Sequence, residues 1–170
     1  MQSARDRRLQ ADAAKVRHLV DESGNTLRLV SISGAPPTRY VIEYHCRSFG
    51  LGSDGQPTER MQHQVEITLG ANYPFEMPSA RMLTPVFNPH VYTNQAICLG
   101  HRWMPNEALD TLVLKIGALL QFDPMVLDFN SLANQAAGRW ARDNRGRLPL
   151  DHVTFHAPKR PRERIQWFTG

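Results

Sequence analysis

The sequence lacks long apolar runs, a secretory leader pattern and all but two cysteines. No stretch of about 18 consecutive apolar residues occurs, so we expect no membrane-spanning helix and no membrane partner. The charges of the first residues are followed by no apolar segment, which predicts that the chain is not secreted. Two cysteines are too few for a small disulfide-stapled scaffold, and we expect free thiols in a reducing cytoplasm.

Excess charge of either sign is also missing from most of the chain. The net charge is +4, but residues 139–170 hold eight basic and three acidic side chains, which leaves −1 for the first 138 residues. Nucleic-acid-binding domains more often spread positive charge over a folded face with interleaved aromatic residues. We therefore expect a basic C-terminal tail over residues 151–170 and no specific nucleic-acid partner.

Length and hydrophobic periodicity predict one α+β domain over residues 1–150. The chain has 170 residues, 41% of them hydrophobic, which is enough for an ordinary core. Helical spacing of apolar residues predicts helices over 5–20 and 109–120, and a third helix is expected over 131–144. Alternating or apolar segments predict four strands, at 27–32, 40–47, 64–69 and 80–86. Grouped strands followed by grouped helices are typical of an α+β fold with an antiparallel meander.

Two helix starts are predicted from capping chemistry. Ser131 is a candidate N-cap of the last helix, because its hydroxyl could accept a hydrogen bond from a free backbone N–H. Pro105 and Asn106 lie where the start of the preceding helix is expected.

The two cysteines occur in different contexts. Cys46 is in phase with Tyr40, Ile42 and Tyr44, which predicts a buried core thiol. Cys98 lies in an irregular segment near His90, and loops on a rigid scaffold often carry reactive groups. Local pattern alone leaves open whether Cys98 is a nucleophile.

Other chemistries for Cys98 fit the sequence less well. A zinc site could use His90, Cys98 and His101, but no second Cys/His pair completes four ligands. The His-x-Glu and Pro-Cys-x-x-Cys motifs of zinc deaminases are absent, as are protease-like cysteine signatures. No Gly-rich phosphate loop occurs, so a covalently bound substrate would have to arrive already activated.

Five motifs in a fixed order resemble the ubiquitin-conjugating (E2) family. They are Tyr73-Pro-Phe-Glu-Met-Pro78, Phe87-Asn-Pro-His-Val-Tyr92, Ile97-Cys98-Leu99, Trp103-x-Pro105 and Asn130-Ser-Leu-Ala-Asn134. The resemblance extends from the first helix to about Asn144, and the third residue of the Asn-Pro-His turn lies eight before the cysteine, as in that family. It implies the E2 (UBC-like) fold: an N-terminal helix, a four-stranded antiparallel meander, an irregular active-site segment and C-terminal helices.

The resemblance implies a carrier function for Cys98. The thiol would accept a ubiquitin-like protein from an E1-like activating enzyme as a thioester and pass it to an amine on a target protein, with no cofactor. His90 occupies the position that usually supplies a side-chain amide to the oxyanion, and Asn88, Asn130 and Ser131 complete the candidate catalytic set. The alternative for His90 is that it braces the loop. The alternative for the chain is a non-catalytic E2-fold binding module, which the retained Ile-Cys-Leu motif argues against.

The resemblance also implies partner surfaces. Arg7 and Arg8 of the first helix would meet the E1, unless they only form a solvated helix face. By their positions in the matching motifs, Phe75, Pro105 and Asn106 would form a ligase-facing patch. The alternative for Phe75 is that it packs on the core. The motifs do not specify an oligomeric state.

Departures from the usual pattern imply a particular branch. The turn is Asn-Pro-His rather than His-Pro-Asn, the interval between Cys98 and Trp103 is short, and no usual final helix is evident. A histidine at this position occurs in an amino-terminus-directed branch of the family. These features suggest a bacterial E2-like protein of a ubiquitin-like conjugation operon, of the kind used in antiphage defence. In the tail, Trp167-Phe168 is either an intramolecular clip or a partner-docking motif.

Overall fold

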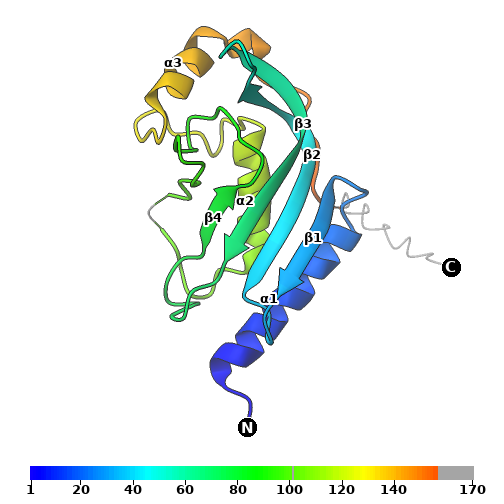
Figure 1. Ribbon diagram of the computed structural model, residues 1–170. Coiled ribbons are helices and arrows are strands. Elements are labelled where there is room, and N and C mark those ends of the chain that lie inside the picture. The colour runs from blue at the N-terminus through cyan, green and yellow to red at the C-terminus, as the bar shows by residue number, and fades with distance from the viewer. Residues whose placement is uncertain (101, 157–170) are drawn as a thin grey trace, which may run out of the picture.

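The computed structural model describes residues 1–100 and 102–156, and it confirms the predicted α+β order (Figure 1). The helices and strands are α1 (Ala4–Asp21), β1 (Leu27–Ser33), β2 (Arg39–Leu51), β3 (Pro57–Thr68), β4 (Ser79–Met82), α2 (Leu109–Leu120) and α3 (Gln135–Asp143), followed by a single 3₁₀ turn (Arg145–Arg147). Within the described ranges, no helix combines the length and apolarity needed to cross a membrane.

The four strands form an antiparallel meander in the order β1-β2-β3-β4. β2 continues to Leu51 and β3 begins at Pro57, so this hairpin is longer than predicted. A bulge after His45 interrupts the ladder between β2 and β3, which explains why the period-two pattern ended early in the sequence. β4 stops at Met82 instead of Val86, because the chain leaves the sheet there and passes toward Cys98.

α1 and α2 cover one face of the sheet, and the main core lies between this face and the two helices (Figure 1). The apolar stripe of α2 contributes Leu112, Val113 and Ile116, all almost fully buried. Cys46 is buried in the same core, as predicted, and burial raises the pKa of its thiol to about 12. A thiol with so high a pKa is protonated at neutral pH, so Cys46 has a packing role.

α2 covers the predicted range, Leu109–Leu120, but Pro105 and Asn106 do not start it, and its cap comes from another helix. α2 begins at Leu109, and its N-cap residue Ala108 makes no side-chain capping bond. The carboxylate of Asp12 in α1 accepts the Leu109 N–H instead, at 3.2 Å. Pro105 and Asn106 form an exposed turn before the helix.

The predicted cap of α3 is also wrong. The helix begins at Gln135, and the Asn134 side chain accepts the Ala137 N–H at 3.0 Å, so Ser131 is not the N-cap. The Ala133 and Asn134 N–H groups both donate to the Pro89 carbonyl, at 2.9 and 3.1 Å. These are the two amides that a Ser131 cap would have satisfied, and the turn before Cys98 already provides their acceptor.

The Asp12 carboxylate is a buried junction between α1, α2 and two loops. Its side chain accepts hydrogen bonds from Arg8 at 2.6 Å and from the Tyr73 hydroxyl. The Arg8 guanidinium also contacts Tyr73 and donates to the carbonyls of Pro105 and Glu107. Burial alone would lower the pKa of Arg8, but the hydrogen bonds and negative charges of Asp12 and Tyr73 together outweigh it and raise the pKa.

The packed body continues past the expected boundary at residue 150. Phe155 is buried and contacts Tyr44 edge to face, and its ring lies where a side chain on Gly117 of α2 would clash. Val153 N–H donates to the Gln121 side chain at 2.7 Å. The tail residues 157–170, which include Trp167-Phe168, lie outside the described residues.

Removing the Asp12 carboxylate tests this junction. We expect Asp12→Ala to lower the free energy of unfolding by about 3 kcal/mol or more, because it leaves a partly buried Arg8 cation unpaired and α2 uncapped. Urea unfolding followed by circular dichroism measures the change. Asp21→Ala, an exposed change at the end of α1, should stay within about 0.5 kcal/mol of wild type. Equal losses in both variants would contradict a special role for Asp12.

Candidate functional site

Cys98 lies in a small cavity of about 100 Å³ after β4, and its side chain is partly exposed. The backbone around it is held on both sides. Cys98 N–H donates to the His90 carbonyl at 2.8 Å, and Ile97 N–H donates to Ala80 of β4 at 2.9 Å. On the other side the Lys115 ammonium of α2 donates to the Leu99 carbonyl. The thiol is therefore presented on a fixed backbone at the surface, where both access and positioning are available.

The turn before Cys98 is built around a buried asparagine. Asn88 is fully buried; its carbonyl oxygen accepts the His90 N–H at 2.9 Å and its amide donates to the Leu119 carbonyl of α2 at 2.8 Å. Both ends of the Asn88 side chain thus hold the turn against α2. This geometry makes Asn88 a positioning residue rather than a group that touches a substrate.

The His90 ring lines the same cavity as Cys98 and is almost fully buried. Its Nε2 accepts the Asp128 N–H at 2.9 Å, which assigns the ring proton of the neutral imidazole to Nδ1. Burial lowers the pKa of His90, an effect opposed by the negative charge of Asp128 and reinforced by the positive charge of Lys115. At neutral pH the ring is therefore uncharged, and it braces the segment that follows α2.

Three further residues with ionisable side chains lie around Cys98 and were not predicted from the sequence. Asp128 and Lys115 line the cavity from the segment after α2 and from α2 itself. Tyr92 is half exposed, and the negative charge of an ionised Cys98 nearby raises the pKa of its hydroxyl. The sequence marks them only weakly: Lys115 is a lone cation within the apolar run of α2, and Tyr92 is the last residue of the Phe87-Asn-Pro-His-Val-Tyr92 motif.

The remaining candidate catalytic residues divide into two places. Ser131 is partly buried and lines the Cys98 cavity. Asn130 is exposed and does not line it; its backbone N–H donates to the Asp128 carboxylate at 2.8 Å. The structure therefore brings His90 and Ser131 to Cys98 and leaves the Asn130 side chain outside the cavity.

The proposed partner loops lie side by side next to α1. Trp103 Nε1–H donates to the Pro74 carbonyl at 2.7 Å, which joins the loop of Phe75 to the loop of Pro105 and Asn106. Phe75 is 80% exposed, so the alternative that it packs on the core is wrong. Pro105 and Asn106 are exposed as well.

The two arginines of the first helix have different environments. Arg7 is exposed and remains a candidate contact for a partner. Arg8 is neither a free partner contact nor part of a solvated face. Its guanidinium donates hydrogen bonds to Asp12, Tyr73 and two backbone carbonyls. A charged group with four internal partners is a structural element.

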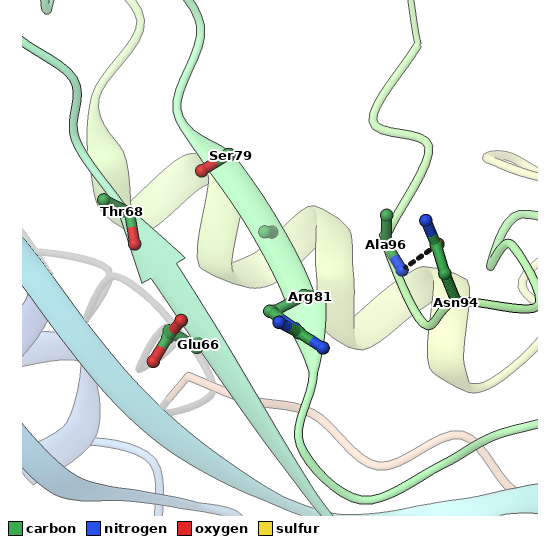
Figure 2. Close-up of a pocket in the computed structure, with 7 residues that line it drawn as sticks. Glu66, Thr68, Ser79, Arg81, Asn94 and Ala96 are labelled. Carbon is green, nitrogen blue, oxygen red and sulfur yellow. Dashed lines mark hydrogen bonds between the residues drawn. The ribbon is translucent and has the colours of Figure 1, made fainter.

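A second cavity, of about 430 Å³, lies over β3 and β4 (Figure 2). Glu66 and Thr68 of β3, Ser79 and Arg81 of β4, and Asn94 and Ala96 line it, and the Asn94 side chain accepts the Ala96 N–H at 3.0 Å. It contains neither Cys98 nor a histidine. Its lining offers polar contacts but no nucleophile paired with a base.

The donor set for a metal is incomplete in the part of the chain that the structure covers. No group of three His, Cys, Asp or Glu side chains there could hold an ion. His101, one of the three residues of the zinc alternative, lies outside the described residues, and the Nε2 atom of His90 already accepts a hydrogen bond.

Comparison with known proteins defines the class. The sequence profile described as "Ubiquitin-conjugating enzyme" matches residues 43–147, which is more than half of the chain and includes β2 to α3. The chain belongs to the ubiquitin-conjugating enzyme family.

Individual relatives agree with this assignment. The chain is 31% identical over 116 residues to "Ubiquitin-conjugating enzyme E2 2" of Mycosarcoma maydis, covering 66% of this chain and 60% of that protein. It is 30% identical over 92 residues to "Ubiquitin-conjugating enzyme E2 T" of Bos taurus, covering 48% of this chain and 47% of the relative. The chain thus spans about half to three-fifths of the length of these curated relatives.

Solved structures confirm the predicted E2 fold. A ubiquitin conjugating enzyme from Trypanosoma cruzi superposes with a TM-score of 0.62 at 18% identity, covering 85% of this chain and 94% of that one. One from Plasmodium yoelii gives a TM-score of 0.60 at 21% identity, covering 86% and 88%. At these identities the similarity defines the fold: an N-terminal helix, a four-stranded antiparallel sheet and C-terminal helices.

A pH titration tests the environment of His90. We expect its pKa to lie below the ordinary value near 6.5, with the proton of the neutral ring on Nδ1. Asp128→Asn removes a negative charge and should lower the pKa further, whereas Lys115→Met removes a positive charge and should raise it. Imidazole ¹⁵N NMR reports both the pKa and the tautomer.

The matched control for this titration is Asp110→Asn, a charge change on α2 away from the cavity. It should leave the His90 titration unchanged. A wild-type His90 that titrates at or above 6.5 would contradict the burial argument.

The lowered pKa of His90 also predicts a pH dependence of the free energy of unfolding. Because the unfolded chain binds this proton more tightly than the folded one, the contribution of His90 to stability is complete above pH 6.5 and decreases as the pH falls below it.

Proposed function

We propose that this protein is an E2-type carrier, which accepts a ubiquitin-like protein from an E1-like activating enzyme as a thioester on Cys98 and transfers it to an amine of a target protein. The observation that supports this most strongly is the partly exposed Cys98 thiol, held on a braced backbone in a cavity bounded by His90, Lys115 and Asp128. Family membership supports a carrier role for ubiquitin-like proteins in general.

The first step is a thioester exchange. The Cys98 thiolate attacks the carbonyl of the E1-bound thioester, the tetrahedral oxyanion collapses, and the E1 thiolate leaves. One carbon–sulfur bond forms as another breaks, so the reaction free energy of the exchange is small. The protein therefore contributes mainly by positioning the reacting groups. Fixing the backbone on both sides of Cys98 supplies that positioning without a nucleotide or metal on this chain.

The second step joins the modifier to the target. An uncharged amine attacks the Cys98 thioester, a carbon–nitrogen bond forms as the carbon–sulfur bond breaks, the nitrogen releases one proton to solvent, and Cys98 leaves as a thiolate. Target amines arrive mainly as ammonium ions at neutral pH, because the unperturbed lysine pKa is about 10.4. Asp128 is an acidic side chain lining the cavity, so its carboxylate attracts the ammonium and orients the nitrogen as the proton is lost to solvent.

His90 is proposed to stabilise the oxyanion of this step. Its Nε2 is engaged by the Asp128 N–H, which leaves Nδ1–H as the donor of a ring that lines the cavity. A donor held in place before the reaction stabilises developing charge without reorganising. The bracing contact and the donor role therefore use different nitrogens of one ring, and the two roles considered for His90 are compatible.

The biological setting is proposed from the sequence departures. The Asn-Pro-His turn and the short interval between Cys98 and Trp103 favour a bacterial conjugation system, with an E1-like enzyme, a ubiquitin-like protein and a target protein as partners. Arg7 is the proposed E1 contact on α1, and Phe75, Pro105 and Asn106 form the proposed ligase-facing patch.

Variants of the two cysteines test the carrier assignment. With E1, ATP and the modifier, Cys98→Ala should form no adduct, whereas Cys98→Ser should form an oxyester that resists thiol reductants. Cys46→Ser should still charge, with a loss of stability only, since Cys46 is buried in the core. Denaturing gels with and without reductant distinguish these adducts. Charging by Cys98→Ala would refute the assignment, and a folded wild type that never charges would favour the binding-module alternative.

The oxyanion role is tested on the discharge step. In single turnover with preformed thioester and excess amine, His90→Ala should slow discharge by about 10²-fold, while thioester formation falls much less. His90→Asn should restore part of the rate, because an amide can both accept the Asp128 N–H and donate to the oxyanion. If a folded His90→Ala variant discharges at the wild-type rate, the oxyanion role is wrong and His90 only braces the loop.

A further inference from the structure

An apolar groove of about 470 Å³ lies on the other side of the segment that closes the Cys98 cavity. Neighbouring residues of this segment alternate between the two hollows: Val126 and Asp128 line the Cys98 cavity, whereas Leu127 and Phe129 line the groove. The groove and the thiol are therefore separated by the thickness of one chain segment.

The lining of the groove has a definite chemistry. Its apolar lining comes from two stretches of the chain: Phe122, Pro124, Leu127 and Phe129 after α2, and Leu148, Pro149 and Leu150 after the 3₁₀ turn. The charged or titratable side chains among the described residues that line it are Arg145 and His152, and no acidic side chain does so. Leu150 is 86% exposed, which is unusual for a leucine beside an apolar hollow. The volume of the groove lies within the range of ordinary ligand sites, about 300–1,000 Å³.

Two further arginines lie close to the groove, and the neighbouring carboxylate of Asp151 is paired with Arg47. Arg142 donates to the Phe129 carbonyl at 2.8 Å and stacks on the Phe129 ring, and Arg147 stacks on Trp140 close by. Positive potential at the rim favours an occupant that carries carboxylates next to its apolar side chains. It disfavours the chain's own C-terminal segment, in which Lys159, Arg160, Arg162 and Arg164 precede Trp167.

We infer that this groove binds the target protein, through a short segment in which large apolar side chains are flanked by acidic residues. This inference rests on the proposed function. We assign the groove to the target protein, not to the E1 or the modifier, because the target's amine must approach Asp128. Asp128 belongs to the same segment as Leu127 and Phe129, which line the groove. A target chain anchored in the groove delivers a neighbouring lysine to Cys98 across that segment.

Binding to the uncharged full-length protein is the first test. The probe is a short labelled peptide with a Leu-Phe pair, flanking Asp and Glu residues and one lysine, and fluorescence anisotropy measures its affinity. Arg145→Glu and Leu150→Ser should each weaken binding about tenfold, equivalent to about 1.4 kcal/mol. The matched controls are Arg139→Glu, exposed on α3, and Leu51→Ser, exposed at the end of β2; both should bind as wild type.

Discharge of preformed thioester is the second test. At low peptide concentration, Arg145→Glu and Leu150→Ser should discharge to the peptide about tenfold more slowly than wild type, with unchanged discharge to free lysine. Peptide binding is measured without E1 or modifier, so it tests whether the groove binds the target segment even if Cys98 never forms a thioester. Normal charging with no peptide binding would refute the groove and leave the carrier function intact.

Two other outcomes would overturn the inference. Equal affinity for a peptide whose acidic flanks are replaced by arginine would remove the charge argument. Binding that occurs only when Trp167 and Phe168 are both changed to serine would show that the groove holds the chain's own C-terminal segment rather than a target.

Discussion

The buried Asp12 carboxylate is the constraint on which most of the architecture depends. It pairs with Arg8 one helical turn away, accepts the Tyr73 hydroxyl and caps the first N–H of α2. A carboxylate is costly to bury, so it is stable here only because each of these donors is present. Through Arg8 the same junction reaches the Pro105 turn, and thereby places the proposed partner loops beside α1.

The Cys98 site depends on α2 in turn. The Leu119 carbonyl fixes Asn88, and Lys115 holds the carbonyl of Leu99, so one helix supports the chain before and after the thiol. The turn and the segment after α2 are joined by three hydrogen bonds, from Asp128, Ala133 and Asn134 to His90 or Pro89. The turn before Cys98, α2 and the segment after α2 thus brace one another, which suits the proposed carrier role of the thiol.

Positioning and chemistry are assigned to different atoms in this site. Asn88 uses its whole side chain for structure, whereas His90 uses one nitrogen for structure and keeps a donor on the other. In the proposed function, the opposite charges of Lys115 and Asp128 bound the space above Cys98. The adjacent apolar groove would then extend recognition from the reacting atoms to the protein that carries the amine.

Local sequence pattern determined the order of helices and strands, the buried Cys46 and the special context of Cys98, because hydrophobic periodicity and turn chemistry act over a few residues. Ser131 was wrongly predicted as the cap of α3, which Asn134 provides three residues later. Pro105 and Asn106 were wrongly predicted at the start of α2, because the true cap of that helix is Asp12, about a hundred residues away. Arg8 was read as a surface residue for the same reason. Only the tertiary structure could bring Lys115 and Asp128 to Cys98, since their partners lie in other segments and leave no local signal.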